Sequence, residues 1–546
     1  MGNTRFNISA PILVAIGLAA GVLLGATMIN QGTSDHEVVN SVVKFREVIS
    51  NIEKSYVDDV ESEVLVNDAI SKMLEKLDPH SIYIPKSDVE LTNADLKGEF
   101  EGIGIEFNII RDTIIVVSPI SGGPSEGAGI KSGDKIIEVD GENVAGIGIN
   151  LRGVIDRLRG PKGSEVIVGI LRRKSIKLDE FKIIRDKIPQ FSVDVGYMIN
   201  DQIGYIKISR FSATTYDEFR KELENLKSQG LEKLILDLQG NPGGYMDRAV
   251  NVADEFIAGD KLIVSQDGRV KRYNSEYRAF KKGLFEDGPL IVLINEGSAS
   301  GSEIVAGALQ DHDRALIVGR RSFGKGLVQM PIPLSDGSEL RLTISRYYTP
   351  SGRSIQKPYN GDMDIYHADR IQRYEHGEFF NEDSIFVNDS LIYKTSKGRT
   401  VYGGGGIMPD YFVPMDTAYD SQYFTDLFYN NVIREYTLEY FNENRESLEK
   451  MGLDEFNNEF VVTENMLHEL VKLGKKVEVS FDRNEFEKSK PLIRNRIKAY
   501  IARSAWNSKG WYKVANEYNE TFQEALNHFD KAEHLASTES LVNEKY

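Results

Sequence analysis

The chain has 546 residues, a formal net charge of −17 and no cysteine. Its length exceeds what one hydrophobic core supports, so we expect several domains. The acidic charge argues against nucleic acid as a partner, because phosphate binding needs clustered lysine and arginine. The absence of cysteine excludes disulfides, thiolate metal sites and a cysteine nucleophile.

A long apolar segment without ionisable residues runs from Ile8 to Ile29. Twenty-two helical residues span about 33 Å, enough to cross a hydrocarbon core of about 30 Å. Arg5 precedes the segment and Asp35 follows it, which favours an amino terminus on the inner side. We expect a transmembrane anchor at 8–29, with a cleaved signal peptide as the alternative. In both cases the body is exported, and the expected location is the bacterial inner membrane with a periplasmic body.

The following segment, residues 36–97, has apolar residues at helical spacing from His36 to about Glu90. A second amphipathic run extends from Val64 to Leu77 and is stopped by the Asp78-Pro79 pair. We expect a small helical cap.

Short β runs separated by glycines occupy residues 98–186. The pattern predicts a β-rich domain with one helix. The strands are expected at 114–117, 135–139 and 166–171, and the helix at 151–158.

Two strings in this segment resemble PDZ domains: Gly102-Ile103-Gly104-Ile105, and the glycine-rich stretch 122–134. The resemblance implies that N–H groups at the two glycines converge on the terminal carboxylate of a peptide. It also implies that Ile103 and Ile105 help to line an apolar pocket, while the peptide adds as an extra strand. The alternative is that Gly102 and Gly104 only shape the entry to a strand.

Residues 187–415 alternate between apolar strands and helical runs, which predicts an α/β core with a largely buried sheet. The strands are expected at 204–208, 233–238 and 290–295, and the helices at 219–227 and 249–257. Residues 416–546 are aromatic, charged and helical in pattern. The predicted fold class is therefore α/β and multidomain, with a helical cap, an inserted β-rich domain and a helical carboxy-terminal region.

Three strings of the core carry the candidate chemistry: the turn Pro242-Gly243-Gly244, the serine-rich string 295–304, and Gly324-Lys325-Gly326. The serines lie between a buried strand and an expected helix, where free N–H groups and the helix dipole stabilise an oxyanion. A second N–H group can come from the Gly243-Gly244 turn. A serine needs a base. Lys325 can serve if burial lowers its pKa by about three units from about 10.4.

Together these strings closely resemble the carboxy-terminal processing, or tail-specific, proteases, from the helical cap to about Asp410. The resemblance implies that Ser300 is the nucleophile and Lys325 the general base. It further implies that Gln329 orients the lysine. No metal, nucleotide or other cofactor is implied.

The same resemblance assigns the oxyanion N–H groups to Gly243 and Gly301. The chain departs from the family pattern at Gly301, where alanine is common, and at Gln239, where arginine is usual. Gly301 still has an N–H group, so the mechanism is unaffected. The change at Gln239 removes a charge.

Several neighbouring residues have competing interpretations. Ser298 and Ser302 could be helix caps or could be mistaken for the nucleophile. Glu303 belongs to the motif but also suits the first turn of a helix. Asp237 is expected to be a hydrogen-bonding residue at a strand end. His312 beside carboxylates suggests a Ser–His–Asp arrangement, although a solvated histidine at a helix end is the simpler interpretation.

The expected function is a serine endopeptidase that cleaves exported proteins near their carboxy termini, with the PDZ-like domain binding the tail. Its expected partners are proteins with free carboxy-terminal tails, the membrane and, by family resemblance alone, further copies of the chain in a homo-oligomer. Two alternatives are a catalytically inactive PDZ adaptor and an esterase-type hydrolase on the same core.

Overall fold

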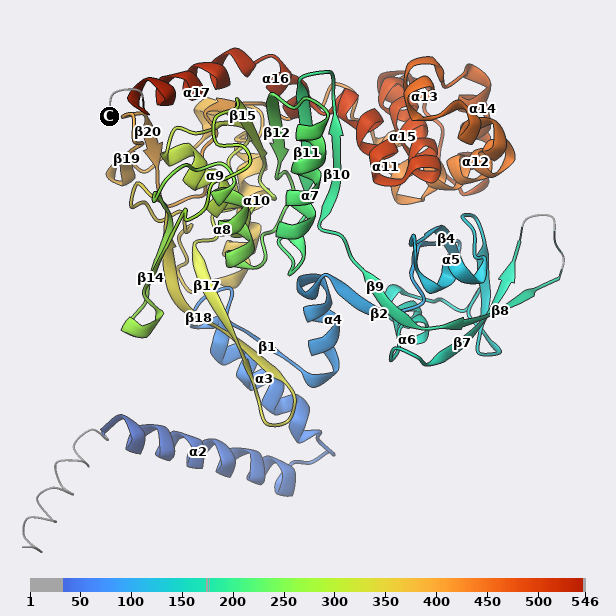
Figure 1. The fold of residues 1–546 in the computed structure, drawn as a ribbon. Helices are drawn as coiled ribbons and strands as arrows, with labels where there is room; N and C mark the ends of the chain where they lie inside the picture. The colour runs from blue at the N-terminus through green and yellow to red at the C-terminus, as the bar shows by residue number, and fades with distance from the viewer. Residues whose placement is uncertain (1–32, 173–174, 176, 544–546) are drawn as a thin grey trace, which may run out of the picture. The chain divides into compact units, whose positions relative to one another are not determined.

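The computed structural model describes residues 33–172, 175 and 177–543 (Figure 1). It contains two compact units, residues 1–76 and 77–546. Within the described residues, no helix combines the length and apolar character needed to cross a membrane. The predicted segment 8–29 lies outside the described residues, so the anchor stays a prediction.

The first unit contains helix α2 (Thr33–Ser55) and helix α3 (Ser62–Glu75). Both helices were expected from the apolar spacing. The predicted helical region from His36 to about Glu90 is interrupted by a short strand, β1 (Ile82–Ile84), in the second unit. Its residues follow Pro79 and are β-branched or aromatic, which favours a strand. A further helix, α4 (Lys86–Lys97), follows β1.

The largest sheet of the second unit has the strand order β10-β11-β12-β15-β16-β21. Its pairs are parallel except β10–β11. The strands are β10 (Val193–Met198), β11 (Ile203–Ile208), β12 (Lys233–Asp237), β15 (Leu290–Ile294), β16 (Leu316–Gly319) and β21 (Tyr411–Phe412). The three apolar runs predicted as strands coincide with β11, β12 and β15, so the α/β core is confirmed.

Helices cover both faces of this sheet, which explains the nearly continuous apolar strands. On one face lie α7 (Thr215–Ser228), α8 (Met246–Asp254) and α9 (Gly301–Asp311). On the other face lie α16 (Glu520–Leu526) and α17 (Phe529–Asn543). The end of the chain therefore completes the core, although its sequence shows no motif that predicts this.

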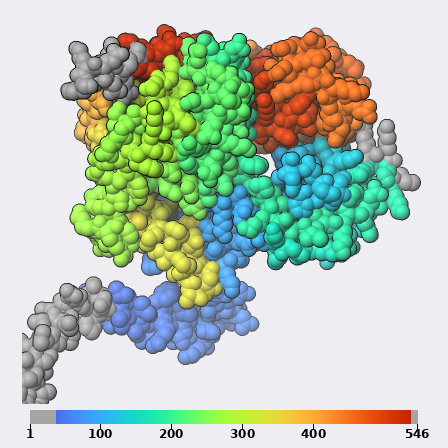
Figure 2. Space-filling view, in the orientation of Figure 1, coloured from blue at the N-terminus to red at the C-terminus, as the bar shows by residue number. Residues whose placement is uncertain are grey.

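A second sheet has the order β1-β18-β13-β14, with β17 paired to β18. Its strands are β13 (Leu262–Asp267), β14 (Ser275–Arg278), β17 (Leu327–Pro333) and β18 (Glu339–Tyr348), and a short helix, η1 (Lys271–Tyr273), precedes β14. The β17–β18 hairpin reaches the surface, where it appears in yellow (Figure 2). Because β17 begins two residues after Lys325, this hairpin positions the candidate base.

The β-rich domain contains a sheet of order β3-β4-β5-β7-β8, with β6 paired to β5, and a separate β2–β9 pair. Its elements are β2 (Glu99–Gly102), β3 (Ile105–Ile110), β4 (Thr113–Pro119), α5 (Pro124–Ala128), β5 (Lys135–Val139), β6 (Glu142–Asn143), α6 (Leu151–Leu158), β7 (Glu165–Leu171), β8 (Asp179–Ile184) and β9 (Asp186–Pro189). The predicted strands fall in β4, β5 and β7, and the predicted helix is α6.

A segment between β18 and β21 adds helix α10 (Met363–Glu375). It also adds η2 (Glu382–Ser384), η3 (Asp389–Leu391) and the β19–β20 pair (Ile392–Lys394 and Thr400–Tyr402). The helical carboxy-terminal region then contributes α11 (Gln422–Tyr429), α12 (Val432–Met451), α13 (Leu453–Glu459), α14 (Glu464–Lys476), α15 (Arg483–Ala515) and η4 (Asn516–Tyr518). These five α-helices share a hydrophobic core of their own.

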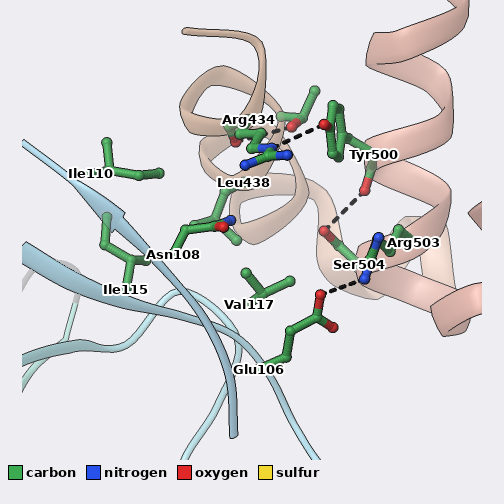
Figure 3. A pocket seen from close by; sticks show the side chains of 11 residues that line it. Glu106, Asn108, Ile110, Ile115, Val117, Arg434, Leu438, Tyr500, Arg503 and Ser504 are labelled. Carbon is green, nitrogen blue, oxygen red and sulfur yellow. Dashed lines mark hydrogen bonds and ion pairs between the residues drawn. The ribbon is translucent and has the colours of Figure 1, made fainter. Parts of the chain in front are cut away.

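Helices α12 and α15 contact the β-rich domain at strands β3 and β4. Arg503 pairs with Glu106, and Arg111 pairs with Glu435 at 2.9 Å. Figure 3 shows the pocket of ≈ 200 Å³ between these elements, with the ion pair of Arg503 at its edge. Polar contacts and a small pocket, rather than a shared hydrophobic core, therefore characterise this junction.

Helix α9 is fixed at its carboxyl end by a fully buried ion pair between Asp311 and Arg353, 2.8 Å apart. We predict that Asp311→Asn lowers the free energy of unfolding by about 3–5 kcal/mol, because it leaves a buried guanidinium without its counter-charge. Urea unfolding followed by circular dichroism measures this change. The matched control is Asp156→Asn, which removes an exposed partner of Arg152 and should leave the unfolding midpoint unchanged. Equal effects of the two substitutions would contradict the prediction.

Candidate active site

Ser300 lies between the end of β15 and the first residue of α9. Its backbone has φ 52° and ψ −110°, a conformation that a non-glycine residue adopts only under strain. Its side chain is partly exposed, and it forms a capping box with Glu303, the third residue of α9. The turn therefore presents a partly exposed hydroxyl at a helix amino terminus.

The two neighbouring serines are buried and use their hydroxyls in the backbone. Ser298 Oγ donates to the carbonyl of Leu238 at 2.8 Å. Ser302 Oγ donates to the carbonyl of Asn241 at 2.9 Å. Both hydroxyls therefore fasten this turn to the end of β12, while the hydroxyl of Ser300 stays available.

The predicted oxyanion residues, Gly243 and Gly301, lie against Ser300. A Cβ atom on Gly243 would stand 2.7 Å from the Cβ of Ser300 and 2.8 Å from the nitrogen of Gly301, so only glycine fits. The Gly301 N–H group makes no hydrogen bond among the described residues, whereas the Gly243 N–H group donates to Asn241 Oδ1 at 2.8 Å. One of the two predicted donors is therefore free in this structure, and the other is occupied by a side chain.

Lys325 follows the loop after β16 and is partly buried. Its amine donates to Gln329 Oε1 at 3.0 Å, which places the predicted orienting residue beside it. Burial lowers the pKa of Lys325, and the nearby carboxylate of Glu303 only partly opposes this effect. Neither an ion pair of this amine nor a hydrogen bond to Ser300 Oγ occurs within the described residues. Catalytic hydrogen bonds are often long before substrate binds.

Glu303 connects the nucleophile segment to the base segment and is fully buried. Its carboxylate accepts from the backbone N–H groups of Ser300 at 2.8 Å and Lys325 at 2.9 Å. It also accepts from Gly324 N at 2.7 Å and from Ser322 Oγ. Burial raises the pKa of Glu303 to about 7, although these donors oppose the shift. The motif thus supplies a carboxylate that joins two strings about 20 residues apart in sequence.

Tyr347, on β18, reinforces this junction. Its buried hydroxyl lies 2.6 Å from the carbonyl oxygen of Lys325 and 3.1 Å from that of Ser300. Sequence analysis did not identify Tyr347 or the linking role of Glu303. A signal for Glu303 was present, because it is an acidic residue near the start of an otherwise small and apolar helix.

His80 is a further residue that the sequence analysis missed. Its carbonyl oxygen accepts from Gln329 Nε2, so it holds the amide that contacts Lys325. Burial, together with the charge of Lys325, lowers the pKa of His80 to about 3. Its imidazole is therefore neutral near neutral pH.

Three other residues discussed above have structural roles. His312 lies at the carboxyl end of α9, about 18 Å along the helix axis from Ser300, and contacts the carbonyl of Leu262. Asp237 is buried and accepts from Tyr205 and Lys207, in agreement with a strand-end role. Gln239 accepts from Asn519 at 3.2 Å. His312 is thus not placed to act as a base for Ser300.

The predicted tail-binding residues, Gly102 to Ile105, join β2 to β3 in the β-rich domain. Gly104 has φ +75°, and its carbonyl accepts from Ile120 N at 3.0 Å. The carbonyl of Ile103 accepts from Ser125 N at 3.0 Å. The side chains of Ile103 and Ile105 are buried in the domain's hydrophobic core. These residues therefore form a tight loop on a different sheet from Ser300.

A groove of ≈ 1010 Å³ adjoins the strand that follows Lys325. Leu327 and Gln356 line it near the base, and residues 342–346 of β18 form another side. Exposed polypeptide can lie against such a strand. The groove is thus a candidate path for a peptide substrate.

Four parts of the sequence match models of known families. Residues 202–365 match peptidase family S41, and residues 102–183 match a PDZ domain. Residues 24–88 match the activating protease CtpB N-terminal domain, and residues 423–507 match a family of unknown function, DUF8443. The S41 match contains Ser300, Lys325 and Gln329.

The chain is 39% identical to the carboxy-terminal-processing protease of Bartonella bacilliformis over 350 residues, 62% of this chain and 80% of that protein. It is 38% identical to carboxy-terminal processing protease CtpB of Bacillus subtilis, over 59% of this chain and 66% of that protein. A solved photosystem II D1 C-terminal processing protease is 30% identical, over 57% of this chain and 89% of that chain, with a TM-score of 0.33. The chain therefore belongs to the carboxy-terminal-processing protease family, peptidase family S41, and is a serine peptidase with a PDZ domain.

Proposed function

We propose that the protein is an endopeptidase that cleaves exported proteins near their carboxy termini through a Ser300–Lys325 dyad. The observation that carries this proposal is the buried carboxylate of Glu303, which accepts N–H groups from both residues of the dyad. A shared carboxylate holds the two backbones in a fixed relation. The strained, partly exposed Ser300 and the partly buried amine of Lys325, which forms no ion pair among the described residues, then have the properties that nucleophile and base require.

In the first step, neutral Lys325 accepts the proton of the Ser300 hydroxyl while the oxygen attacks the peptide carbonyl. The protonated amine returns the proton to the leaving nitrogen, and an acyl-enzyme forms. Water, activated by the same amine, then releases the acyl group. Gln329 holds the amine through its Oε1 atom at 3.0 Å. Before it attacks, the amine has to turn from this contact towards Ser300.

The developing oxyanion is stabilised by backbone N–H groups at the amino terminus of α9. Gly301 supplies a free N–H group there. Gly243 supplies the second donor after its N–H group leaves Asn241 Oδ1, 2.8 Å away. Asn241 is buried, and its side-chain amide also donates to the carbonyl of Ile208. We therefore expect the Gly243 N–H group to leave Asn241 only when substrate binds.

The loop Gly102-Ile103-Gly104-Ile105 captures the free carboxylate of the substrate tail, and the tail pairs with β3. Gly104 supports this role because its φ of +75° turns the backbone sharply before the strand. The protein acts outside the cytoplasm, anchored by residues 8–29 or released after their removal. Assembly into a homo-oligomer is part of the same proposal.

We predict that Ser300→Ala lowers kcat/KM on an unstructured protein with an apolar tail by at least about a thousandfold. Lys325→Arg should be equally inactive, because arginine stays protonated at accessible pH. In the wild type, kcat/KM should rise with pH as the amine of Lys325 loses its proton, at a pH below the ordinary lysine pKa. Gel-based cleavage assays measure these rates. Wild-type cleavage by Ser300→Ala would refute the proposed mechanism.

We predict that Glu303→Gln lowers kcat about 10- to 100-fold, because an amide has one acceptor oxygen and leaves backbone N–H groups of the dyad unpaired. The matched control is Glu255→Gln, which alters a fully buried glutamate that accepts from Tyr216 and Leu284 at the end of α8. Both variants should lose stability, but only Glu303→Gln should lose kcat. Steady-state kinetics beside thermal unfolding separate the two effects, and equal kcat values would contradict the prediction.

We predict that amidation of a substrate's carboxy terminus lowers kcat/KM at least about tenfold, because the loop at Gly104 loses its anionic ligand. Gly104→Ala should abolish this preference, since a Cβ atom there is strained and would stand 2.9 Å from Ile188 Cδ1. Gly141→Ala is the control: it has the same kind of strain at φ +80° in the same domain, but open space around it. If Gly141→Ala also abolishes the preference, the loop is not the tail site.

A further inference from the structure

Helix α10 begins at Met363 and continues past residue 365, where the match to the peptidase family ends. Its first turn nevertheless places Tyr366 close to the candidate base. Tyr366 is buried, with 4% of its surface exposed. Its hydroxyl lies 2.9 Å from His80 Nε2 and 3.4 Å from Gln356 Nε2. A tyrosine from outside the matched family region thus contacts two residues around Lys325.

Each of these two partners holds one side of the base segment. The carbonyl of His80 accepts from Gln329 Nε2, and Gln329 Oε1 accepts from the amine of Lys325 at 3.0 Å. Gln356 Oε1 accepts from the N–H group of Gly326 at 2.8 Å, directly after the lysine. The amine and the backbone of Lys325 are therefore both connected to one tyrosine hydroxyl.

The protonation states suit these contacts. Because His80 is neutral, its Nε2 atom can accept the hydroxyl proton of Tyr366, and the same oxygen can accept from Gln356. The ring of Tyr366 is fixed in addition by Phe323, at 6.3 Å between ring centroids, and by the amine of Lys357, 4.1 Å from the ring centroid. These ring contacts therefore hold the hydroxyl of Tyr366 in a fixed position.

We propose that Tyr366 is a positioning residue for the general base: through its bonds to His80 and Gln356 it holds Gln329 and Lys325 in the orientation that reaction requires. This inference rests on the proposed Ser300–Lys325 mechanism. Tyr366 contacts neither the substrate nor the reacting atoms. Its hydrogen bonds hold the base segment in place and so limit the access of water to the amine of Lys325.

The first test is a double-mutant cycle. Tyr366→Phe removes the hydroxyl and keeps the ring, while His80→Phe breaks the same hydrogen bond from the other side. Each single variant should lower kcat about five- to tenfold with KM unchanged, and the double variant should lose no more than one single variant does. Tyr374→Phe, on the same helix, is the control and should match the wild type. Additive losses, or a wild-type kcat for Tyr366→Phe, would overturn the inference.

The second test follows the amine itself. The groups that face Lys325 are Glu303, Asp78, Arg341 and the His80 ring, and Tyr366→Phe changes none of them. When the hydrogen bonds of Tyr366 to His80 and Gln356 are lost, hydration of the amine of Lys325 raises its pKa towards the ordinary value. The pH at which a fluorophosphonate probe labels Ser300 half-maximally should then rise by about half a unit. An unchanged pH profile would mean that the tyrosine is only structural.

Comparison of Tyr366→Phe with Ser300→Ala distinguishes this inference from the proposed function. If Ser300→Ala is inactive while Tyr366→Phe behaves like the wild type in rate and pH profile, the positioning role is wrong and the proposed mechanism stands. If Ser300→Ala cleaves normally, the mechanism fails first, whatever Tyr366→Phe does. Should Tyr366→Phe fold poorly in thermal unfolding, the kcat of His80→Phe decides the positioning role, and a wild-type kcat overturns it.

Discussion

The carboxylate of Glu303 is the interaction on which the site depends. It is fully buried, and burying a charge is costly unless donors surround it. Four donors do so, from residues 300, 322, 324 and 325. Because each donor belongs to a segment that must be near Ser300, the cost of burying this carboxylate is met only when the site is assembled. A pKa raised to about 7 shows that desolvation still outweighs the donors.

Helix α9 connects the site rigidly to the hydrophobic core. Every one of its residues, from Gly301 to Asp311, is buried, so the helix cannot shift without disturbing the packing on the sheet. Its amino end carries the strained Ser300 and the glutamate, and its carboxyl end is held by the Asp311–Arg353 pair. Backbone strain at Ser300 persists because the surrounding structure over-determines the turn. Rigid attachment at both ends is what makes a strained, accessible serine tolerable.

Local pattern predicted much of this fold. The strands β11, β12 and β15 were expected from continuous apolar runs, and α6, β4, β5 and β7 from spacing and glycines. The strand β1 was not, because its three residues gain their partner from β18, more than 250 positions away. Helices α16 and α17 were expected only as helices, since nothing in their own sequence shows that they cover the sheet.

The site divides in the same way. The family resemblance singled out Ser300, Lys325, Gln329, Gly243 and Gly301, and the structure places them around the amino end of α9 and the segment that follows β16. The sequence could not show that Asn241 accepts the N–H group of Gly243. Nor could it show that Tyr347 contacts Ser300 and Lys325, or that His80 contacts Gln329. Those contacts join residues from different strands and loops. A single sequence carries no period or spacing that records them.

Two lysines of the second unit, Lys325 and Lys357, show why position alone does not make a base. Burial lowers the pKa of both amines. Lys357 has a carboxylate partner, Asp369, at 3.0 Å, and its amine lies about 4 Å from two ring centroids. These contacts stabilise the charged form. Lys325 has only a neutral amide at 3.0 Å, and no ion pair within the described residues. Lys325 therefore lacks the contacts that hold the amine of Lys357 in its charged form.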